Sequence, residues 1–264
     1  MKARIKFSKT GSMRFIGHLD VMRYFQKAFR RAGIRISYSQ GYSPHQLMSF
    51  ASPLGLGLTS EGEYLDIALE DAMTKEEMLV KVNAQMNDEI AVVDFTMLED
   101  LAKPSMAVFA AADYVIYGKE GYELPSGFLD RFSAFLMQEE IIVTKKTKKS
   151  EKEMDIRPYI YEYAFTYDDW KKIVPGQTLS ILEGEEDLQV LCYLRLTAGS
   201  IMNIKPELVL EAFCQKEGME FNPYAYSIHR LEMYADDGAP KGKVRTKYDD
   251  EPCKLVPLSV YAAQ

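Results

Sequence analysis

The amino-acid sequence predicts an α+β protein built from two ferredoxin-like domains in tandem, each with the element order β-α-β-β-α-β. Three observations support this prediction. Strand and helix patterns follow that order in the first hundred residues, a similar order recurs after residue 105, and 264 residues with 47% hydrophobic content can bury two cores of ordinary size. We place the boundary at Pro104, so that the first domain spans residues 1–104 and the second spans residues 105–264.

Apolar periodicity marks the elements of the first domain. Ala3, Ile5 and Phe7 alternate with charged residues, which is typical of a strand with one buried face. Thr74 is expected to cap a helix, with Glu77 as the partner in a capping box. The predicted elements are, in order, a strand at 2–7, a helix at 18–32, strands at 34–38 and 63–70, the helix after Thr74, and a strand at 89–97.

The second domain is predicted to repeat this order with a longer middle. Its elements are a strand at 108–117, a helix at 125–137, strands at 141–146 and 188–197, a helix at 205–216 and a strand at 225–234. Residues 148–187 fit neither copy of the order, so they are treated as an insertion. Residues after Asp236 are expected to form an extended C-terminal tail.

The cysteines and the hydropathy restrict the class of protein. Cys192, Cys214 and Cys253 are widely separated and form no CxxC or Cys/His group, so no metal or cofactor is predicted and the chain is not expected to be a radical SAM, iron–sulfur or zinc enzyme itself. Structural thiols are the expected role. No apolar stretch approaches the roughly 20 residues of a membrane span, and the N-terminus lacks a signal sequence, which predicts a cytoplasmic protein without a membrane partner.

The net charge of −7 hides a strong asymmetry. Residues 1–50 contain ten Lys and Arg against one acid, Asp20, whereas the remainder contains 22 basic and 38 acidic residues. A basic N-terminal face attached to an acidic remainder favours an anionic partner on one side of the molecule.

The first predicted helix carries much of this basic charge. Its apolar stripe includes Met22, Phe25 and Phe29, and its basic residues fall on the opposite side. The alternative is an ordinary solvated face. The predicted RNA-binding residues are those of this helix, Arg23, Lys27, Arg30 and Arg31, together with Arg14, Arg35 and Tyr42, and a lysine cluster in a hairpin, Lys145, Lys146, Lys148, Lys149 and Lys152.

Two histidines are candidate catalytic residues. His45 lies in a turn-rich loop beside Tyr42, where it could act as a general acid or base on ribose and phosphate, although an exposed loop histidine without a function is the alternative. His18, near the start of the basic helix, fits a buried or capping role as well as a catalytic one. His229 is expected to be structural.

Recognised catalytic motifs are absent from the sequence. No GxSxG, Walker loop or HExxH occurs, and Gly55-Leu56-Gly57 leads into a predicted strand instead of a helix, so it offers no helix N-terminus to a phosphate. This absence favours a binding or accessory role over an enzyme. General acid–base sites leave no regular motif, so enzymatic activity stays open.

Several stretches resemble a known family. They are the run from Met13 to Leu69, including MRFIGHLD and GLTSEGEYLD, then DIRPYI from Asp155, NIKPELVLEAF from Asn203 and IHRLEMY from Ile228. The chain resembles the bacterial radical-SAM-linked protein family, a domain of unknown function fused to, or encoded beside, a cobalamin-binding radical SAM protein. For a chain that is not fused to the radical SAM protein, the resemblance implies a separate radical SAM partner acting in trans.

The N-terminal stretch is also similar to CRISPR repeat-processing endoribonucleases. That resemblance implies two ferredoxin-like domains and an RNA-binding basic surface. Those enzymes have a glycine-rich loop near the C-terminus, and the segment Gly238-Ala239-Pro240-Lys241-Gly242-Lys243 is only loosely comparable.

Three functions therefore stand as hypotheses. The first is a non-catalytic accessory protein that binds RNA, tRNA or rRNA rather than DNA, and presents it to a radical SAM modification enzyme. The second is a metal-independent endoribonuclease that uses His45 or His18. The third is a protein-interaction module that binds no nucleic acid.

Overall fold

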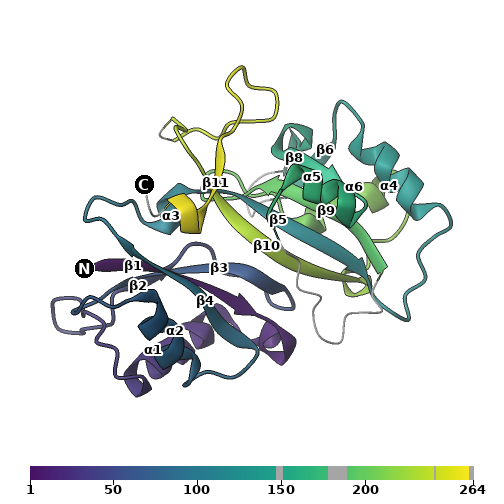
Figure 1. Ribbon diagram of the computed structural model, residues 1–264. Coiled ribbons are helices and arrows are strands. Elements are labelled where there is room, and N and C mark those ends of the chain that lie inside the picture. The colour runs from purple at the N-terminus through teal and green to yellow at the C-terminus, as the bar shows by residue number, and fades with distance from the viewer. Residues whose placement is uncertain (147–150, 178–188, 241, 262–264) are drawn as a thin grey trace. The chain divides into compact units, whose positions relative to one another are not determined.

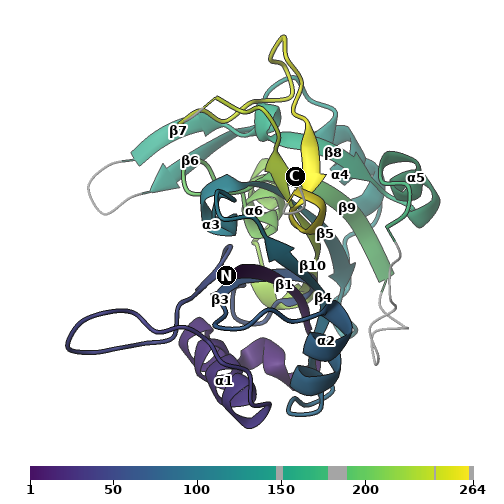
Figure 2. The same cartoon turned by 60° about the vertical axis from the view of Figure 1, so that its left-hand side comes forward.

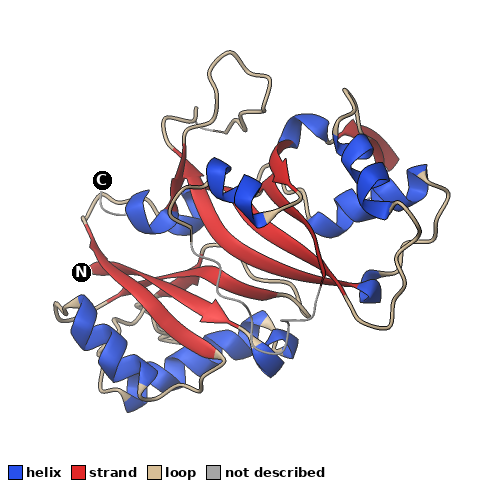
Figure 3. Ribbon diagram, turned by 45° about the vertical axis from the view of Figure 1, so that its right-hand side comes forward, coloured by secondary structure: helices blue, strands red, loops and turns tan. Residues whose placement is uncertain are grey.

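The computed structural model describes residues 1–146, 151–177, 189–240 and 242–261. Its strands and helices confirm the α+β class (Figure 3). The chain divides into two compact units, which we call the first and second units. The first unit comprises Met1–Ala110, His229–Gly238 and Lys254–Gln264, and the second comprises Ala111–Ile228 and Ala239–Cys253.

The first unit contains the predicted β-α-β-β-α-β order. Its elements are β1 (Lys2–Lys9), the short 3-10 helix η1 (Gly11–Phe15), α1 (His18–Arg31), β2 (Met48–Phe50), β3 (Thr59–Ala68), α2 (Lys75–Asn83) and β4 (Ile90–Leu98). Strand β1 pairs antiparallel with both β3 and β4, and β2 pairs antiparallel with β3. The strands therefore run in the order β4-β1-β3-β2.

Later parts of the chain complete the first unit. From His229 onwards, β10 (Tyr226–Asp236) lies parallel to the start of β3, with His229 opposite Thr59. Strand β11 (Leu255–Pro257) pairs with the end of β10. Two short helices, α3 (Ser105–Val108) and α7 (Leu258–Tyr261), also belong to this unit.

Alternation along β1 separates two chemically different faces. Helices α1 and α2 lie on one side of the strands of this unit (Figures 1 and 2). Ile5 and Phe7 belong to the core on that face, where Phe25 of α1 meets the Phe7 ring at 4.8 Å. On α1, spacing of four, seven and eight residues buries Val21, Phe25, Ala28 and Phe29. The predicted capping box of α2 is confirmed, because Thr74 and Glu77 exchange both hydrogen bonds.

Charged residues of β1 alternate onto the other face, where each has a partner. The guanidinium of Arg4 binds the Asp66 carboxylate, with 2.7 Å from Nε to Oδ1, and donates to the Leu258 carbonyl of α7 at 3.0 Å. Lys6 binds Glu232 of β10 at 2.6 Å, and Glu232 also accepts from the hydroxyl of Tyr64 at 2.7 Å. Such pairing offsets the cost of burying these charges.

The second unit follows a longer element order. It contains most of β5 (Phe109–Gly118), then α4 (Phe128–Leu136), β6 (Ile142–Lys146), β7 (Glu151–Asp155), the 3-10 helix η2 (Arg157–Tyr159), β8 (Ile160–Ala164), α5 (Tyr167–Ile173), β9 (Gln189–Thr197), α6 (Pro206–Lys216) and the 3-10 helix η3 (Pro223–Ala225). Strand β9 pairs antiparallel with β5 and with β8. Phe128 and Phe132 of α4 pack on Phe213 of α6, at ring distances of 5.1 and 4.9 Å.

Three sequence-based expectations differ from the structure. Residues 34–38 form two isolated bridges, Ile36 with Leu69 and Tyr38 with Gln46, and β2 is the strand that follows α1 and pairs with β3. The predicted strand at 141–146 exists as β6 but pairs, among the described residues, only with β7, so the tandem repeat of one ferredoxin-like order is not confirmed. The insertion contains β8, a neighbour of β9, and the tail contains β11 and α7.

A glycine permits the close approach of β10 to β3. A Cβ atom added to Gly62 would lie 2.7 Å from the Leu231 carbonyl oxygen and 2.7 Å from the Glu232 Cα, both of which are backbone atoms. We expect Gly62→Ala to lower the free energy of unfolding by about 2 kcal/mol, because the backbones must separate. Urea denaturation measures this loss.

Gly55→Ala is the matched control. Its added Cβ would meet only Leu58 side-chain atoms, the nearest at 3.6 Å, which is ordinary contact. If both variants unfold at the wild-type urea concentration, the close approach of β3 and β10 does not exist in solution.

Candidate nucleic-acid interface

The predicted basic residues of α1 share its solvent-facing side. Arg23, Lys27, Arg30 and Arg31 are all exposed, and Asp20 is the acidic residue of the same helix. Positions separated by four, seven and eight residues lie on one helical face, so these side chains form a continuous cationic surface. We call these four residues the α1 basic face.

The four residues of the α1 basic face differ in whether their side chains already have a partner within the protein. Arg23 pairs with Asp20 at 3.2 Å, and Arg31 donates to the Gln85 carbonyl at 2.6 Å. Within the part of the chain that the structure describes, Lys27 and Arg30 have neither a hydrogen-bond nor an ion-pair partner. These two residues therefore carry the charge that is available to an external anion.

The other predicted basic residues of the first unit have partners. Arg35 binds Asp71 through two hydrogen bonds, one of them 2.7 Å from Nε to Oδ2, and lies 3.5 Å from Glu70. Hydrogen bonding to Asp71 raises the pKa of the Arg35 guanidinium. Arg14, in η1, donates from Nε to the Gly11 carbonyl at 2.8 Å. Arg35 is thus the weakest of the predicted phosphate contacts.

A small pocket lies at the N-terminal end of α1. It has a volume of about 20 Å³, which is enough for one water molecule. Most of its wall is apolar, and two cationic or titratable side chains, Lys9 and His18, line it together with the Glu63 carboxylate. The lining residues are Phe7, Lys9, His18, Val21, Phe50, Pro53, Leu54 and Glu63.

Buried charge surrounds this pocket. Arg230 of β10 holds Glu63 through three hydrogen bonds, at 2.8 Å from Nε and at 2.6 and 2.5 Å from Nη2. Lys9 is 3% exposed, and its ammonium donates to the Ile16 carbonyl at 2.9 Å. Among the described residues, no carboxylate lies within ion-pair distance of the Lys9 nitrogen. Glu63, which lines the same pocket, binds Arg230.

This arrangement changes the acidity of Lys9. Burial lowers the pKa of the Lys9 ammonium from its ordinary value of 10.5, the negative charge of Glu63 opposes that effect, and the positive charge of Arg230 reinforces it. Buried amines with a lowered pKa occur at sites of proton transfer, and His18 lines the same pocket as Lys9. Sequence reasoning missed Lys9, Glu63 and Arg230 as functional candidates.

One sequence feature did place Lys9 on the buried face. The period-2 pattern of Ala3, Ile5 and Phe7 continues to Lys9, so a lysine occupies a position at which an apolar residue is expected. This departure from the apolar pattern is the sequence signal that singles out Lys9.

The two candidate histidines occupy different surroundings. His18 is the first residue of α1, is half-buried, and packs edge to face against Phe50 with 4.9 Å between the rings. His45 is exposed, and its Nδ1 lies 2.8 Å from the Ser39 hydroxyl oxygen. His18 lines the pocket and His45 is not among the lining residues. Tyr42, in the same loop as His45, is fully exposed.

The third histidine is buried in β10. His229 Nδ1 lies 2.8 Å from the Thr59 hydroxyl oxygen, and its Nε2 lies 3.6 Å from Glu61. This contact joins the two paired strands, so the placement agrees with the structural role expected from the sequence.

The predicted lysine cluster falls on the β6–β7 hairpin. Lys145 of β6 is opposite Lys152 of β7 in the strand register. Lys148 and Lys149 lie outside the described residues.

A larger pocket of the first unit has mixed charge. Its volume is about 360 Å³. Arg4, at its wall, already binds Asp66 and two carbonyl oxygens, so it offers little to a ligand. The lining residues are Arg4, Glu99, Leu101, Ala102, Lys103, Asp237 and Tyr261.

The described residues contain neither a cluster of metal ligands nor a membrane-spanning helix. Across residues 1–146, 151–177, 189–240 and 242–261, no three His, Cys, Asp or Glu side chains gather as metal ligands would, and no helix has the length and apolar character needed to cross a bilayer. Cys192 and Cys214 are buried free thiols, and burial raises the pKa of both.

The sequence matches the model of one protein family. Residues 2–206 match the family model described as "Uncharacterized protein conserved in bacteria (DUF2344)", and the chain belongs to this family. A search among curated proteins finds no match. The matched residues run from β1 to the start of α6, and the family description assigns no activity.

The surroundings of Lys9 predict a pH-dependent stability. Because the folded protein releases the Lys9 proton at a lower pH than the unfolded chain, the unfolded state binds more protons between the two pKa values, and the free energy of unfolding rises with pH across that window. We expect the wild type to gain stability relative to Lys9→Met as the pH is raised towards 10.5.

Urea denaturation at a series of pH values measures this difference. Lys27→Met, which removes an exposed lysine, is the control for a general effect of lysine loss. If the free energies of unfolding of the wild type and Lys9→Met change in parallel from neutral pH to 10.5, the result contradicts the buried position of the amine.

Proposed function

We propose that this protein binds RNA through the α1 basic face. The observation that carries the proposal is the pair Lys27 and Arg30, two exposed cations with no partner among the described residues, on the same helical face as Arg23 and Arg31. Cations at this spacing can contact successive phosphates and release their counterions, which supplies most of the affinity of sequence-independent nucleic-acid binding.

Exposed aromatic residues favour RNA over duplex DNA in this proposal. Phe15, three residues before α1, is 73% exposed, and Tyr42 is fully exposed in its loop. Unpaired bases of structured RNA stack on such rings, whereas the bases of a duplex are already stacked on one another. A structured RNA such as tRNA or rRNA is therefore the proposed ligand.

The wider role we propose is that of an accessory protein in RNA modification. The resemblance to radical-SAM-linked proteins supports a radical SAM partner acting in trans, in the cytoplasm. The β-α-β-β-α-β order of the first unit supports a ferredoxin-like domain there, and a second such domain in the second unit is part of the same proposal.

The direct test is charge reversal on the α1 basic face. We expect Lys27→Glu/Arg30→Glu to weaken binding to total tRNA or rRNA fragments by at least about tenfold at moderate salt and to flatten the dependence of affinity on salt. Fluorescence anisotropy at several salt concentrations measures both effects.

Lys81→Glu provides the control, since it reverses an exposed lysine on α2 of the same unit. Equal loss in the control would mean that only the net charge matters. If the wild-type protein binds no RNA but co-purifies with a radical SAM protein, a protein-interaction module is the correct function.

The pocket at α1 favours one alternative, a metal-independent endoribonuclease. His18 and the buried amine of Lys9 both line this pocket, which supports a pair of proton-transfer groups in this alternative. In this alternative, one group removes the proton of a ribose 2′-hydroxyl, which attacks the adjacent phosphorus, and the other protonates the leaving 5′-oxygen.

Cleavage of RNA in the presence of a metal chelator tests the alternative. We expect His18→Ala to reduce any cleavage on the order of 10²-fold, whereas His45→Ala leaves it unchanged because His45 does not line the pocket. RNA that stays intact with wild-type protein rules the nuclease out and leaves RNA binding untouched.

A further inference from the structure

The second unit contains a buried arginine that is not paired with an acid. Arg157 of η2 is 6% exposed, and its guanidinium donates to two backbone carbonyls, from Nε to Gln138 at 3.1 Å and from Nη1 to Ile160 at 3.1 Å. Within the described residues, no carboxylate lies at ion-pair distance from it. Burying a cation without a counter-charge is unfavourable, so the position calls for an anion.

A second cation lies beside Arg157. The backbone N–H of Lys247 donates to the Pro158 carbonyl at 2.9 Å, which fixes this residue next to η2. Burial lowers the pKa of the Lys247 ammonium, the charge of Arg157 lowers it further, and Glu162 acts in the opposite direction. Glu162 is exposed on β8. Two repelling cations are thus held together by backbone contacts.

The segment around Lys247 is anchored at a second point. The hydroxyl of Tyr161 on β8 donates to the Arg245 carbonyl at 2.7 Å. Together with the Lys247 contact, this bond holds the backbone from Arg245 to Lys247 against η2 and the start of β8.

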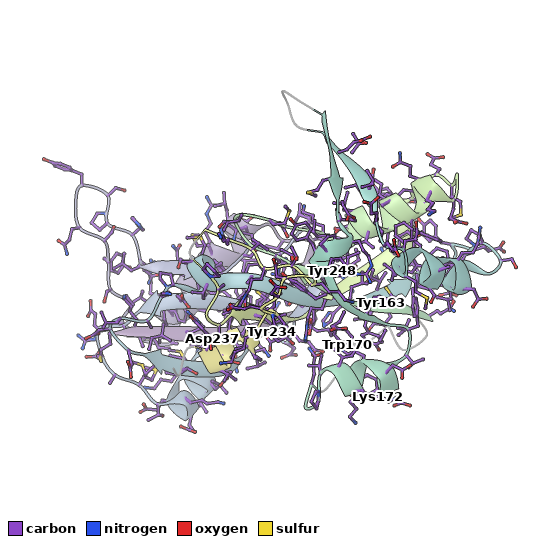
Figure 4. All side chains as sticks on the ribbon, turned by 90° about the horizontal axis from the view of Figure 1, so that it is seen from above. Tyr163, Trp170, Lys172, Tyr234, Asp237 and Tyr248 are labelled. Carbon is purple, nitrogen blue, oxygen red and sulfur yellow. The ribbon has the colours of Figure 1, made fainter. Side chains whose placement is uncertain are left out.

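Aromatic rings accompany these cations. The Tyr163 ring lies 5.9 Å from the Arg157 guanidinium carbon, and Tyr248, next to Lys247 in the chain, is 58% exposed. Figure 4 labels both tyrosines on the second unit. Interleaved basic and aromatic side chains are typical of surfaces that bind single-stranded nucleic acid.

The lysine-bearing hairpin begins at the same place. The Asp155 carboxylate oxygen Oδ1 accepts from the backbone N–H of Ile141 at 2.8 Å and from that of Arg157 at 2.9 Å. One carboxylate therefore fixes the base of the β6–β7 hairpin and the start of η2.

We propose that Arg157 and Lys247 form a binding site for a phosphate group of the RNA backbone, with Tyr248 available to stack on an adjacent base. This inference rests on the proposed RNA-binding function and adds a contact on the second unit. The phosphate would supply the missing counter-charge for Arg157 and offset its repulsion with Lys247. The neighbouring rings favour RNA over an acidic peptide as the source of the anion.

The test measures RNA affinity as a function of salt for Lys247→Ala. Removal of one phosphate contact should reduce the slope of the logarithm of the association constant against the logarithm of salt concentration by about 0.7 for single-stranded RNA. We expect weaker binding by about fivefold for Lys247→Ala and a similar loss for Tyr248→Ala, the latter without a change of slope.

Lys172→Ala is the matched control. Lys172 is an exposed lysine of α5 in the same unit, paired with Asp169 at 2.7 Å, and its removal takes away the same charge. We expect wild-type affinity and slope for this variant. A loss of affinity and slope in Lys247→Ala, but not in Lys172→Ala, would then locate a phosphate at this site.

Other outcomes overturn the inference in distinguishable ways. If the wild type binds RNA and Lys247→Ala matches it in affinity and slope, the site is wrong and RNA binding by the α1 basic face stands. If poly-glutamate competes as well as RNA in a Lys247-dependent manner, the ligand is an acidic protein. If RNA does not bind to the wild type, both this inference and the proposed function fail.

Discussion

The ion pair between Glu63 and Arg230 is the constraint on which the first unit depends. Each residue is 3% exposed, and the two come from β3 and β10, 167 positions apart in the chain. A buried pair of this kind is costly to break, since either partner alone would be an uncompensated charge. By binding Glu63, Arg230 joins β10 to β3. The same ion pair places two opposite charges near Lys9, and they shift the pKa of its ammonium in opposite directions.

Both units contain basic side chains that have no acidic partner among the described residues. In the first unit, Arg23 and Arg35 are ion-paired, while Lys27 and Arg30 are not paired with any described residue. In the second unit, Arg157 binds carbonyl groups only. A protein with net charge −7 has ample carboxylates for these cations. The separation of these cations from acids is the reason why both proposed phosphate contacts are placed at them.

Local patterns in the sequence predicted most helices and strands but not their pairing. The α1 stripe of Phe25 and Phe29, and the capping box of α2, are set by neighbours three or four residues away, so they could be read directly. The pairing of β8 with β9 joins segments separated by an irregular stretch, and the residues 34–38 alternate like a strand without forming a regular ladder. For the same reason, the basic face of α1 was predictable, whereas the Lys9, Glu63 and Arg230 arrangement was not.

The first unit is discontinuous in sequence, and this affects when it can form. Its N-terminal strands are complete by Leu98, but residues 229–238 and the region around Leu258, whose carbonyl accepts from Arg4, come much later. During synthesis, which adds about 5–20 residues per second, residues 1–110 leave the ribosome before β10 exists, and N-terminal segments generally fold first. Until β10 arrives, Glu63 and Lys6 lack their partners, and the part of the β3 edge that pairs with β10 is open. The second unit must therefore be synthesised, and its connection to β10 formed, before the first unit can reach its native state.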